Sequence, residues 1–409
     1  MAPSQRVPIL IVGGGIGGLT AALALARRGV AAHVLEQAGA FAEIGAGIQI
    51  APNASSVLDH LGVLDQISSC AVYPKRMLLV DALSGQTLTA ADLGEPFLRA
   101  FRYRYIVMHR NDLLTILLDA CRQYVGASGG RPALTLETNR HVVAVEDLGD
   151  GARVTCADGA VYTCDALIGA DGLHSVVRAL VIGDGDPICE GFVAYRGAVP
   201  VEDVIEHGGL DTIRYWIGPR LHFIQYPLRR GELYNQVAVF QSDRFRPDAD
   251  PEDWGTVEEL EARFAITHES VQRSLIRIKR DRHWTMYDRP PVENWTLHRI
   301  TLLGDAAHPM LQYIAQGACQ AIEDGEALAD AFATHPGNVD AALRAYQDER
   351  LPRTARVQLT ARQFGDIIHG EGAAAQKRNA VLAGRASDDY THMDWFYAYQ
   401  PQRSLIHEQ

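Results

Sequence analysis

Short apolar runs that end in glycines or in an acidic residue mark the predicted elements at the start of the chain. The run 7–12 predicts a buried parallel strand, and the alanine- and leucine-rich stretch 19–28 has helical spacing. A second apolar run, 31–35, predicts another strand and ends at Glu36. This order of strand, helix and strand predicts a Rossmann-type unit.

The pattern changes in the middle of the chain to strands joined by short turns. Residues 134–167 predict several strands, and from residue 186 onward the alternation is typical of an antiparallel sheet. Polar, mainly helical sequence follows at 252–278. The predicted fold class is therefore α/β, with a Rossmann-type domain that carries an inserted antiparallel β-sheet domain.

The predicted domain boundaries follow these changes of pattern. Residues 1–185 form the Rossmann-type domain, in which 70–107 contributes to the second domain, and 186–290 form that second domain from antiparallel sheet and helices. Residues 291–365 return to the first domain and include a long amphipathic helix that we assign to an interface. Residues 366–409 form an aromatic tail, which we expect to pack on a partner surface or across a cleft.

Charge and composition exclude several classes of partner. The 409 residues carry 38 basic and 50 acidic side chains, a formal net charge of -12, which argues against nucleic acid or an anionic membrane. The six cysteines show no CxxC spacing and predict free thiols in a reducing compartment. Because no signal segment or membrane-spanning apolar run is found in the sequence, we expect a cytoplasmic protein without integral membrane association. No metal-ligand spacing is found either, so we predict no metal site.

Glycines directly after the first strand form the first candidate cofactor site. Gly13, Gly15 and Gly18 stand in the spacing GxGxxG, and Glu36 follows at the distance of the dinucleotide fingerprint. The glycines let the backbone approach a pyrophosphate, and the Glu36 carboxylate can accept hydrogen bonds from ribose hydroxyls. The alternative is a glycine-rich turn without a ligand, which the complete order of strand, helix, strand and acid disfavours.

A second candidate cofactor site follows the apolar run 300–303, which predicts a strand. Asp305 comes directly after this strand, and Gly317 opens the helical run 318–332. This arrangement can hold a phosphorylated, polyhydroxylated cofactor, because the acid accepts from hydroxyls and the helix start offers free N–H groups. Taken alone, Asp305 fits the cap of a structural turn equally well.

Three further segments bear on the same function. The small residues of 42–50 can lie against a planar ligand, with a mobile loop as the alternative. Arg110 stands at a helix start after the strand 105–108, where it reaches a phosphate or makes a surface ion pair. Residues 169–172 end another strand in an acidic, glycine-bearing turn.

These motifs, in this order, resemble the flavoprotein aromatic hydroxylases, the single-component FAD monooxygenases of the salicylate and hydroxybenzoate type. The resemblance covers essentially the whole chain and implies that 1–185 bind FAD and 186–290 the substrate. It implies that the first motif holds the ADP part of FAD, and that FAD and NAD(P)H are both approached at 169–172. The motif that begins at residue 304 would hold the ribityl and pyrophosphate part. The implied FAD-binding residues are Gly13, Gly15, Ile16, Gly18, Glu36, Gln37, Gly47, Ile48, Arg110, Asp305, Gly317 and Ala318.

Departures from the common family pattern narrow the resemblance. Many members have a proline and an asparagine where this chain has Gln312 and Cys319. The runs 311–313, 215–228 and 235–240 are similar to the 3-hydroxybenzoate 6-hydroxylases. This similarity implies a homodimer that converts 3-hydroxybenzoate to gentisate (2,5-dihydroxybenzoate) with NADH and O2, through a flavin hydroperoxide.

The implied reaction needs a phenolate, because a phenolate is more electron-rich at its ortho and para carbons than a phenol. A phenolate forms when the phenolic proton is removed, and histidine suits the removal of this proton near neutral pH. His222 shares one face of the predicted strand 221–226 with Ile224 and Tyr226. The alternative for His222 is a core histidine bonded to a carbonyl. The alternative for Tyr226 is packing within the sheet.

The candidate site residues follow from this reasoning and the resemblance. The candidate catalytic residues are His222, Gln312 and Tyr226, and the candidate substrate-binding residues are Gln49, Tyr105, His222, Tyr226 and Gln312. The group that receives the substrate carboxylate stays open among Tyr105, Gln49 and Tyr226. The sequence contains no second GxGxxG, so NADH is expected to bind transiently.

Two alternative functions remain at this point. One is a salicylate or hydroxynicotinate monooxygenase of the same family, with a small aromatic acid and O2 as substrates. The other is a dinucleotide-binding protein that hydroxylates nothing, which would be distinguished by its lack of flavin colour.

Overall fold

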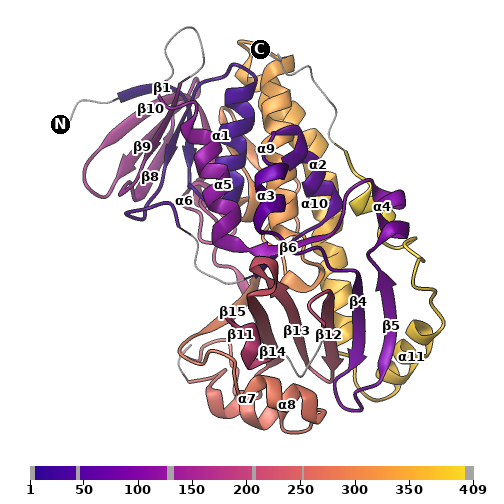
Figure 1. The fold of residues 1–409 in the computed structure, drawn as a ribbon. Helices are drawn as coiled ribbons and strands as arrows, with labels where there is room; N and C mark the ends of the chain where they lie inside the picture. The colour runs from indigo at the N-terminus through magenta and orange to yellow at the C-terminus, as the bar shows by residue number, and fades with distance from the viewer. Residues whose placement is uncertain (1–4, 43–46, 127–132, 205–208, 251–252, 401–409) are drawn as a thin grey trace.

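The computed structural model describes residues 5–42, 47–126, 133–204, 209–250 and 253–400. Two large β-sheets with helices around them make up this part of the chain (Figure 1). The first sheet and its helices occupy the upper part of the view, and the second sheet lies below them. The predicted α/β fold class, with parallel and antiparallel strands, is confirmed.

The first sheet has the parallel centre of a Rossmann-type unit. Its strand order is β16 (Thr296–Leu297), β17 (Ile300–Leu302), β10 (Val161–Gly169), β1 (Gln5–Val12), β2 (Ala32–Leu35) and β7 (Leu134–Glu137), with β9 (Ala152–Cys156) and β8 (Val142–Asp147) beside β10. Strand β1 pairs in parallel with β10 and β2, and β17 pairs in parallel with β10. Since parallel strands point the same way, the turns that follow β1, β10 and β17 meet at one edge of the sheet.

Three helices cover this parallel centre. Helix α1 (Ile16–Arg27) packs against both α9 (Gly317–Thr334) and α5 (Arg110–Arg122). Ten residues of α1, from Ile16 to Ala26, are buried, so its small alanines allow the two neighbouring helices to approach closely. The sequence therefore predicted this unit correctly.

The second sheet forms the lower half of the molecule in Figure 1. Its strand order is β15 (His283–Asp288), β11 (Ile188–Pro200), β14 (Leu233–Gln241), β13 (Leu221–Leu228), β12 (Thr212–Gly218), β4 (Arg76–Asp81) and β5 (Thr87–Asp92). Strands β4 and β5 belong to the earlier segment that we expected to contribute here, and β4 pairs in parallel with β12. Helices α7 (Val257–Phe264) and α8 (Glu269–Leu275) lie below the sheet. The domain boundaries at 185/186, 290/291 and 365/366 stay predictions.

A short antiparallel pair of strands, β3 (Gly47–Ile50) and β6 (Ile106–His109), lies apart from both large sheets in its pairing. Strand β6 contacts β13 of the second sheet and leads directly into α5 of the first domain. The remaining helices are α2 (Pro52–His60), α3 (Leu64–Cys70), α4 (Glu95–Phe101), α6 (Val176–Val181), α10 (Val339–Ile368), α11 (Gly372–Ala383) and α12 (Asp394–Tyr397).

Helix α10 is the long amphipathic helix that the sequence indicated within 291–365, and it continues past residue 365 to Ile368. It carries a buried arginine, Arg350, which donates to the carboxylates of Glu323 and Asp324 on α9. All three side chains are fully buried, and this ion cluster joins the two helices. The cluster matters for function because α9 begins at the candidate cofactor turn.

The aromatic tail packs on its own chain. Tyr390 and Tyr397 contact the rings of Phe97 and Phe101 on α4, with ring centroids 5.4 to 5.9 Å apart. The tail thereby covers α4 of its own chain, whereas we had expected it to pack on a partner surface or across a cleft.

Within the described ranges, no helix is long and apolar enough to cross a membrane. The same part of the chain holds no group of three or more metal-binding side chains. The six cysteines are free, as their spacing predicts.

Candidate functional site

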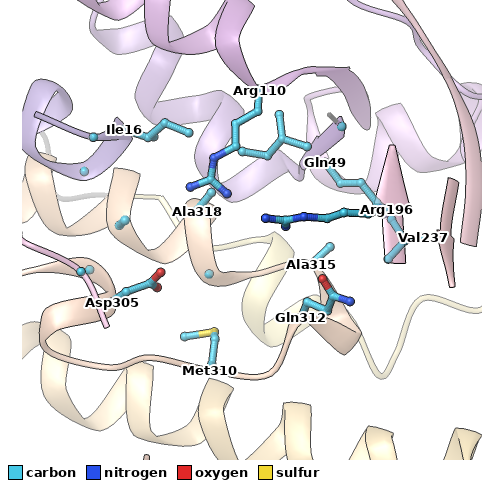
Figure 2. A pocket seen from close by; sticks show the side chains of 18 of the residues that line it. Ile16, Gln49, Arg110, Arg196, Val237, Asp305, Met310, Gln312, Ala315 and Ala318 are labelled. Carbon is cyan, nitrogen blue, oxygen red and sulfur yellow. The ribbon is translucent and has the colours of Figure 1, made fainter. Parts of the chain in front are cut away.

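One cavity of about 350 Å³ lies where the cofactor motifs meet the second sheet (Figure 2). Residues of all three glycine-bearing motifs line it, as do residues of β3, α5 and the second sheet. Its size is that of a small-molecule site. The motifs are far apart in sequence, and the parallel order of β1, β10 and β17 brings them together.

The first motif is a tight turn that tolerates no side chains at two of its glycines. Gly13 has a φ of +110°, and a Cβ built on it would lie 2.2 Å from the carbonyl oxygen of Ala170. A Cβ on Gly18 would lie 2.0 Å from the carbonyl oxygen of Gly13. Gly15 and Ile16 line the cavity, and α1 starts there without a side-chain cap. Its first N–H groups therefore remain available to a phosphate.

Glu36 organises the loop of this motif. Its carboxylate accepts the N–H of Gly14 at 2.9 Å and that of Ala38 at 2.8 Å. Each carboxylate oxygen keeps capacity for a second hydrogen bond. Neither Glu36 nor the exposed Gln37 lines the cavity, so their expected contact with a ribose stays a prediction.

The third motif places an acid and a second helix start on the cavity. The 3-10 helix η4 (Gly304–Ala306) follows β17, and Figure 2 shows the Asp305 carboxylate pointing into the cavity. Gly317 and Ala318, the first residues of α9, also line it, and α9 has no side-chain cap. An acceptor for hydroxyls and free N–H groups for phosphate oxygens therefore face one space.

A buried carboxylate under the turn holds the third motif in place. Asp324 accepts the N–H of Gly304 at 3.0 Å and lies 2.6 Å from His308 Nε2 and 2.8 Å from Arg350 Nε. Burial acts to raise the pKa of Asp324, but His308 and Arg350 outweigh it and lower the pKa to about 2. Asp324 is thus ionised at neutral pH and ties the turn to α9 and α10.

Two guanidinium groups point into the cavity, and the sequence analysis identified one of them. Figure 2 shows Arg110 entering from α5 and Arg196 from β11, opposite Asp305 and Gln312. Arg196 also stacks on Trp284, with its guanidinium carbon 4.4 Å from the ring centroid. The sequence signal for Arg196 is its place as a lone charged residue inside the apolar run 192–199.

The wall opposite the cofactor motifs comes from β3, the second sheet and the 3-10 helix η5 (Gln312–Ile314). Gln49, Ile224, Tyr226 and Gln312 belong to this wall. The amide nitrogen of Gln312 is buried and has no hydrogen-bond partner among the residues that the structure describes. A buried amide N–H without a partner is costly, so a ligand oxygen at this position is favoured.

Gly47 and Ile48 also line the cavity, while 43–46 of the predicted small-residue segment lie outside the described residues. A Cβ on Gly47 would lie 2.5 Å from the hydroxyl oxygen of Tyr226. Gly47 also donates its N–H to Asn235 Oδ1 at 3.0 Å. The glycine therefore lets β3 lie directly against β13 and β14 at the substrate side.

His222 is placed beside the cavity but does not line it. It is fully buried, and its Nδ1 lies 2.8 Å from Nε2 of His369, at the end of α10. Its ring also contacts Tyr313, the residue after Gln312. Burial, and then His369, lowers the pKa of His222 well below its ordinary value, so the ring is neutral at physiological pH. Among the residues that the structure describes, no carbonyl oxygen accepts a hydrogen bond from His222, in contrast to the alternative of a core histidine bonded to a carbonyl.

Tyr105 is the other candidate that does not line the cavity. It is 1% exposed and donates its hydroxyl proton to Gln49 Oε1 at 2.8 Å, behind the wall. Of the five candidate substrate residues, the structure thus brings Gln49, Tyr226 and Gln312 to the cavity and leaves Tyr105 and His222 behind it.

Comparison with known proteins agrees with this geometry. The FAD binding domain family model matches residues 6–361. The chain is 38% identical over 400 residues to a 3-hydroxybenzoate 6-hydroxylase of Polaromonas naphthalenivorans, covering 96% of both chains.

Solved structures with the same fold include HpxO of Klebsiella pneumoniae in complex with FAD and uric acid, at a TM-score of 0.81 and 26% identity over 96% of each chain. A salicylate hydroxylase substrate complex matches at a TM-score of 0.79 and 25% identity, over 97% of this chain and 96% of that one. The chain belongs to the family of FAD-dependent aromatic hydroxylases.

Proposed function

We propose that the protein is a 3-hydroxybenzoate 6-monooxygenase that forms gentisate with FAD, NADH and O2. The observation that carries the proposal is the partnerless amide nitrogen of Gln312, between the cofactor motifs and the second sheet. A phenolate oxygen of the substrate is the acceptor that this donor suits. The relatives named for this reaction support the choice of 3-hydroxybenzoate.

The cavity fits FAD at its cofactor side, because its glycines leave no room for side chains and two uncapped helix starts face it. Bound FAD, reduced by a nicotinamide, supplies the activation of O2. We propose that FAD contacts Gly13, Gly15, Ile16, Gly18, Glu36, Gln37, Gly47, Ile48, Arg110, Asp305, Gly317 and Ala318. Asp305 would accept from its hydroxyls, and the starts of α1 and α9 would donate to its phosphate oxygens.

The chain's own residues prepare the substrate for attack at C6. This carbon lies para to the 3-hydroxyl, so a phenolate at C3 directs an electrophilic oxygen to it. Gln312 would donate to the phenolate oxygen and favour loss of the proton. We propose neutral His222 as the proton acceptor, although it lies behind the wall, and Tyr226 as a second contact of the substrate.

Gln312→Ala and His222→Ala test these two roles separately. Loss of a hydrogen bond to a developing anion costs about 1.5–3 kcal/mol, so Gln312→Ala should slow hydroxylation by roughly ten- to a hundredfold. His222→Ala should slow it at least as much and divert reduced flavin to hydrogen peroxide. Single-turnover hydroxylation with peroxide measured alongside gives both quantities, and FAD content serves as the control. Wild-type rate and coupling in His222→Ala would show that the proton leaves by another route.

We further propose a cytoplasmic homodimer that takes NADH in preference to NADPH. Analytical ultracentrifugation measures the oligomeric state, and the ratio of kcat/KM for NADH and NADPH measures the nicotinamide preference. A monomer, or a preference for NADPH, contradicts the respective part of the proposal.

Consumption of NADH across isomeric ligands tests the substrate assignment. The FAD-loaded enzyme should oxidise NADH rapidly with 3-hydroxybenzoate and slowly without it, because flavin reduction that waits for the substrate limits wasteful formation of hydrogen peroxide. Parallel assays contain salicylate, 4-hydroxybenzoate and 6-hydroxynicotinate. Strong stimulation by salicylate or the hydroxynicotinate, and none by 3-hydroxybenzoate, would replace the assignment with the alternative. Equal oxidation with and without every ligand contradicts both.

A further inference from the structure

The buried histidine behind the substrate wall, His222, has a second histidine as its hydrogen-bond partner. Nδ1 of His222 lies 2.8 Å from Nε2 of His369, and the two rings stack with centroids 5.1 Å apart. His369 follows the last residue of helix α10 and belongs to none of the motifs identified in the sequence. The pair thus joins the candidate proton acceptor to a residue 147 positions further along the chain.

Packing and backbone hydrogen bonds hold His369 in this position. Phe192 of β11 stacks on its ring, with centroids 4.7 Å apart. The N–H of His369 donates to Gly365 O at 3.0 Å, and its carbonyl oxygen accepts the N–H of Arg220 at 3.1 Å. The contact between the two imidazoles is therefore fixed by α10, by β11 and by the turn before β13.

The other ring nitrogen of His222, Nε2, is buried and has no hydrogen-bond partner among the residues that the structure describes, and the same is true of the amide nitrogen of Gln312. The His222 ring contacts the ring of Tyr313, the residue after Gln312, with centroids 5.4 Å apart. On the same face of β13, about 7 Å along the strand from His222, Ile224 lines the cavity. One ligand oxygen between Gln312 and His222 would satisfy both nitrogens.

The hydrogen bond between the two rings determines which nitrogen of His222 can accept a proton. A neutral imidazole has one N–H donor and one acceptor nitrogen. For Nε2 of His222 to accept a proton from a ligand hydroxyl, the proton of His222 must be on Nδ1, which then donates to Nε2 of His369. His369 in turn carries its own proton on Nδ1. An acceptor nitrogen at His369 thus selects the tautomer of His222 that can act as a base.

The second ring of the pair lies nearer the surface. His369 is 8% exposed, whereas His222 is 0% exposed. Burial, and then Arg378, lowers the pKa of His369 to about 3, and Arg378 donates to Ile368 O at 3.0 Å beside this ring. Since the pKa of His222 is also lowered, neither ring retains a positive charge at neutral pH. A proton that reaches the pair therefore moves on to solvent.

We propose that His369 is a positioning residue for proton transfer, which fixes the tautomer of His222 and passes the phenolic proton of the substrate from His222 to solvent. This inference rests on the proposed function, because it takes a hydroxybenzoate as the source of the proton. It gives the end of α10 a part in the reaction.

The transfer moves one proton from the substrate to water. The phenolic O–H bond breaks, the oxygen keeps the electron pair as a phenolate, and an N–H bond forms at Nε2 of His222. The proton on Nδ1 of His222 moves to Nε2 of His369, and the proton on Nδ1 of His369 leaves to water. Both rings end neutral. Passage in the reverse direction returns a proton to the product hydroxyl and restores both tautomers.

The rate of proton release in matched histidine variants tests the proposal. FAD-loaded enzyme in weak buffer near neutral pH, with an indicator dye, is mixed rapidly with 3-hydroxybenzoate in the absence of NADH. Wild type should release a proton as the ligand binds. His369→Phe keeps a ring beside Phe192 but removes the acceptor for His222, so proton release and hydroxylation should both slow by about tenfold. His283→Phe is the matched control and should behave as wild type, because His283 contacts a different ring of the second sheet, Tyr195.

His369→Gln separates proton transfer from packing. Its amide oxygen can accept from Nδ1 of His222, but an amide does not take up a proton. The variant should therefore bind 3-hydroxybenzoate with the wild-type Kd and still release the proton slowly. The melting temperature of each variant with FAD bound is the control for folding.

Wild-type rates of proton release in His369→Phe or His369→Gln overturn the inference and leave the proposed function standing. Hydroxylation by the wild type without proton release on binding overturns it as well. Wild-type enzyme that neither binds nor hydroxylates 3-hydroxybenzoate overturns both the inference and the proposed function.

Discussion

Gly18→Ala should weaken FAD binding by roughly a hundredfold, the equivalent of about 3 kcal/mol. The added Cβ would lie 2.0 Å from the carbonyl oxygen of Gly13. Gly13 cannot retreat, because its N–H is bonded to Leu35 O at 2.8 Å, and the space where its Cβ would stand is taken by the carbonyl oxygen of Ala170, 2.2 Å away. The turn must therefore open, which moves the N–H groups at the start of α1 away from the pyrophosphate.

The measurement is the Kd of FAD for the apoprotein, followed by quenching of flavin fluorescence. Gly384→Ala is the matched control, since Gly384 has a φ of -87° and its nearest neighbour atom for a Cβ is 3.8 Å away. Wild-type FAD affinity in Gly18→Ala would contradict the assignment of this turn to the cofactor.

Arg350→Met should lower the free energy of unfolding by about 3–5 kcal/mol, because it removes the buried cation that two buried carboxylates share. Glu323 and Asp324 are fully buried, and Arg350 bonds both. Arg122→Met is the matched control, because the Arg122–Asp119 pair is exposed and such pairs contribute less than about 1 kcal/mol. Urea unfolding with FAD bound measures both variants. Equal losses in the two would show that the buried cluster does not stabilise the fold.

The same cluster predicts a direction for the pH dependence of stability. The pKa of Asp324 is lowered from 3.8 to about 2 in the folded protein. Its contribution to stability is therefore complete above the unfolded pKa and is lost as the pH falls from about 4 to 2. Without Arg350 this carboxylate protonates more readily, so acid unfolding of Arg350→Met should begin at a higher pH than in wild type. An unchanged acid midpoint would contradict this reasoning.

The cofactor side of the site was predictable because it depends on local order and on one topological rule. A strand, glycines, a helix and an acid close together in sequence specify the turn at Gly13, and the run around Asp305 repeats that logic. The parallel pairing of β1, β10 and β17 then brings both turns to one edge. Asp305 and Gly317 are close to each other in sequence, so no long-range strand pairing is needed to predict that they face the same space.

The substrate side was only partly predictable, because it depends on what packs at long range. The sequence correctly placed His222, Ile224 and Tyr226 on one strand face, yet His369 covers the His222 end of that face from a helix end 147 residues later. Arg196 reaches the cavity because β11 lies between β14 and β15, which the sequence pattern does not specify.

The tail shows the same limit. Its aromatic composition predicted that it covers a surface, and the structure gives α4 of its own chain as that surface. The ring contact between Tyr105 and Tyr397 joins residues far apart in the sequence, and no local spacing indicates it. Contacts of this kind follow from packing of the complete fold.

Product analysis under isotopically labelled oxygen tests the proposed conversion of 3-hydroxybenzoate to gentisate. FAD-loaded enzyme is incubated with 3-hydroxybenzoate, NADH and ¹⁸O₂, and the product is identified by chromatography and mass spectrometry. We expect gentisate that carries one ¹⁸O atom, in the hydroxyl para to the original one. A different dihydroxybenzoate, unlabelled product, or consumption of NADH with hydrogen peroxide as the sole product would contradict it.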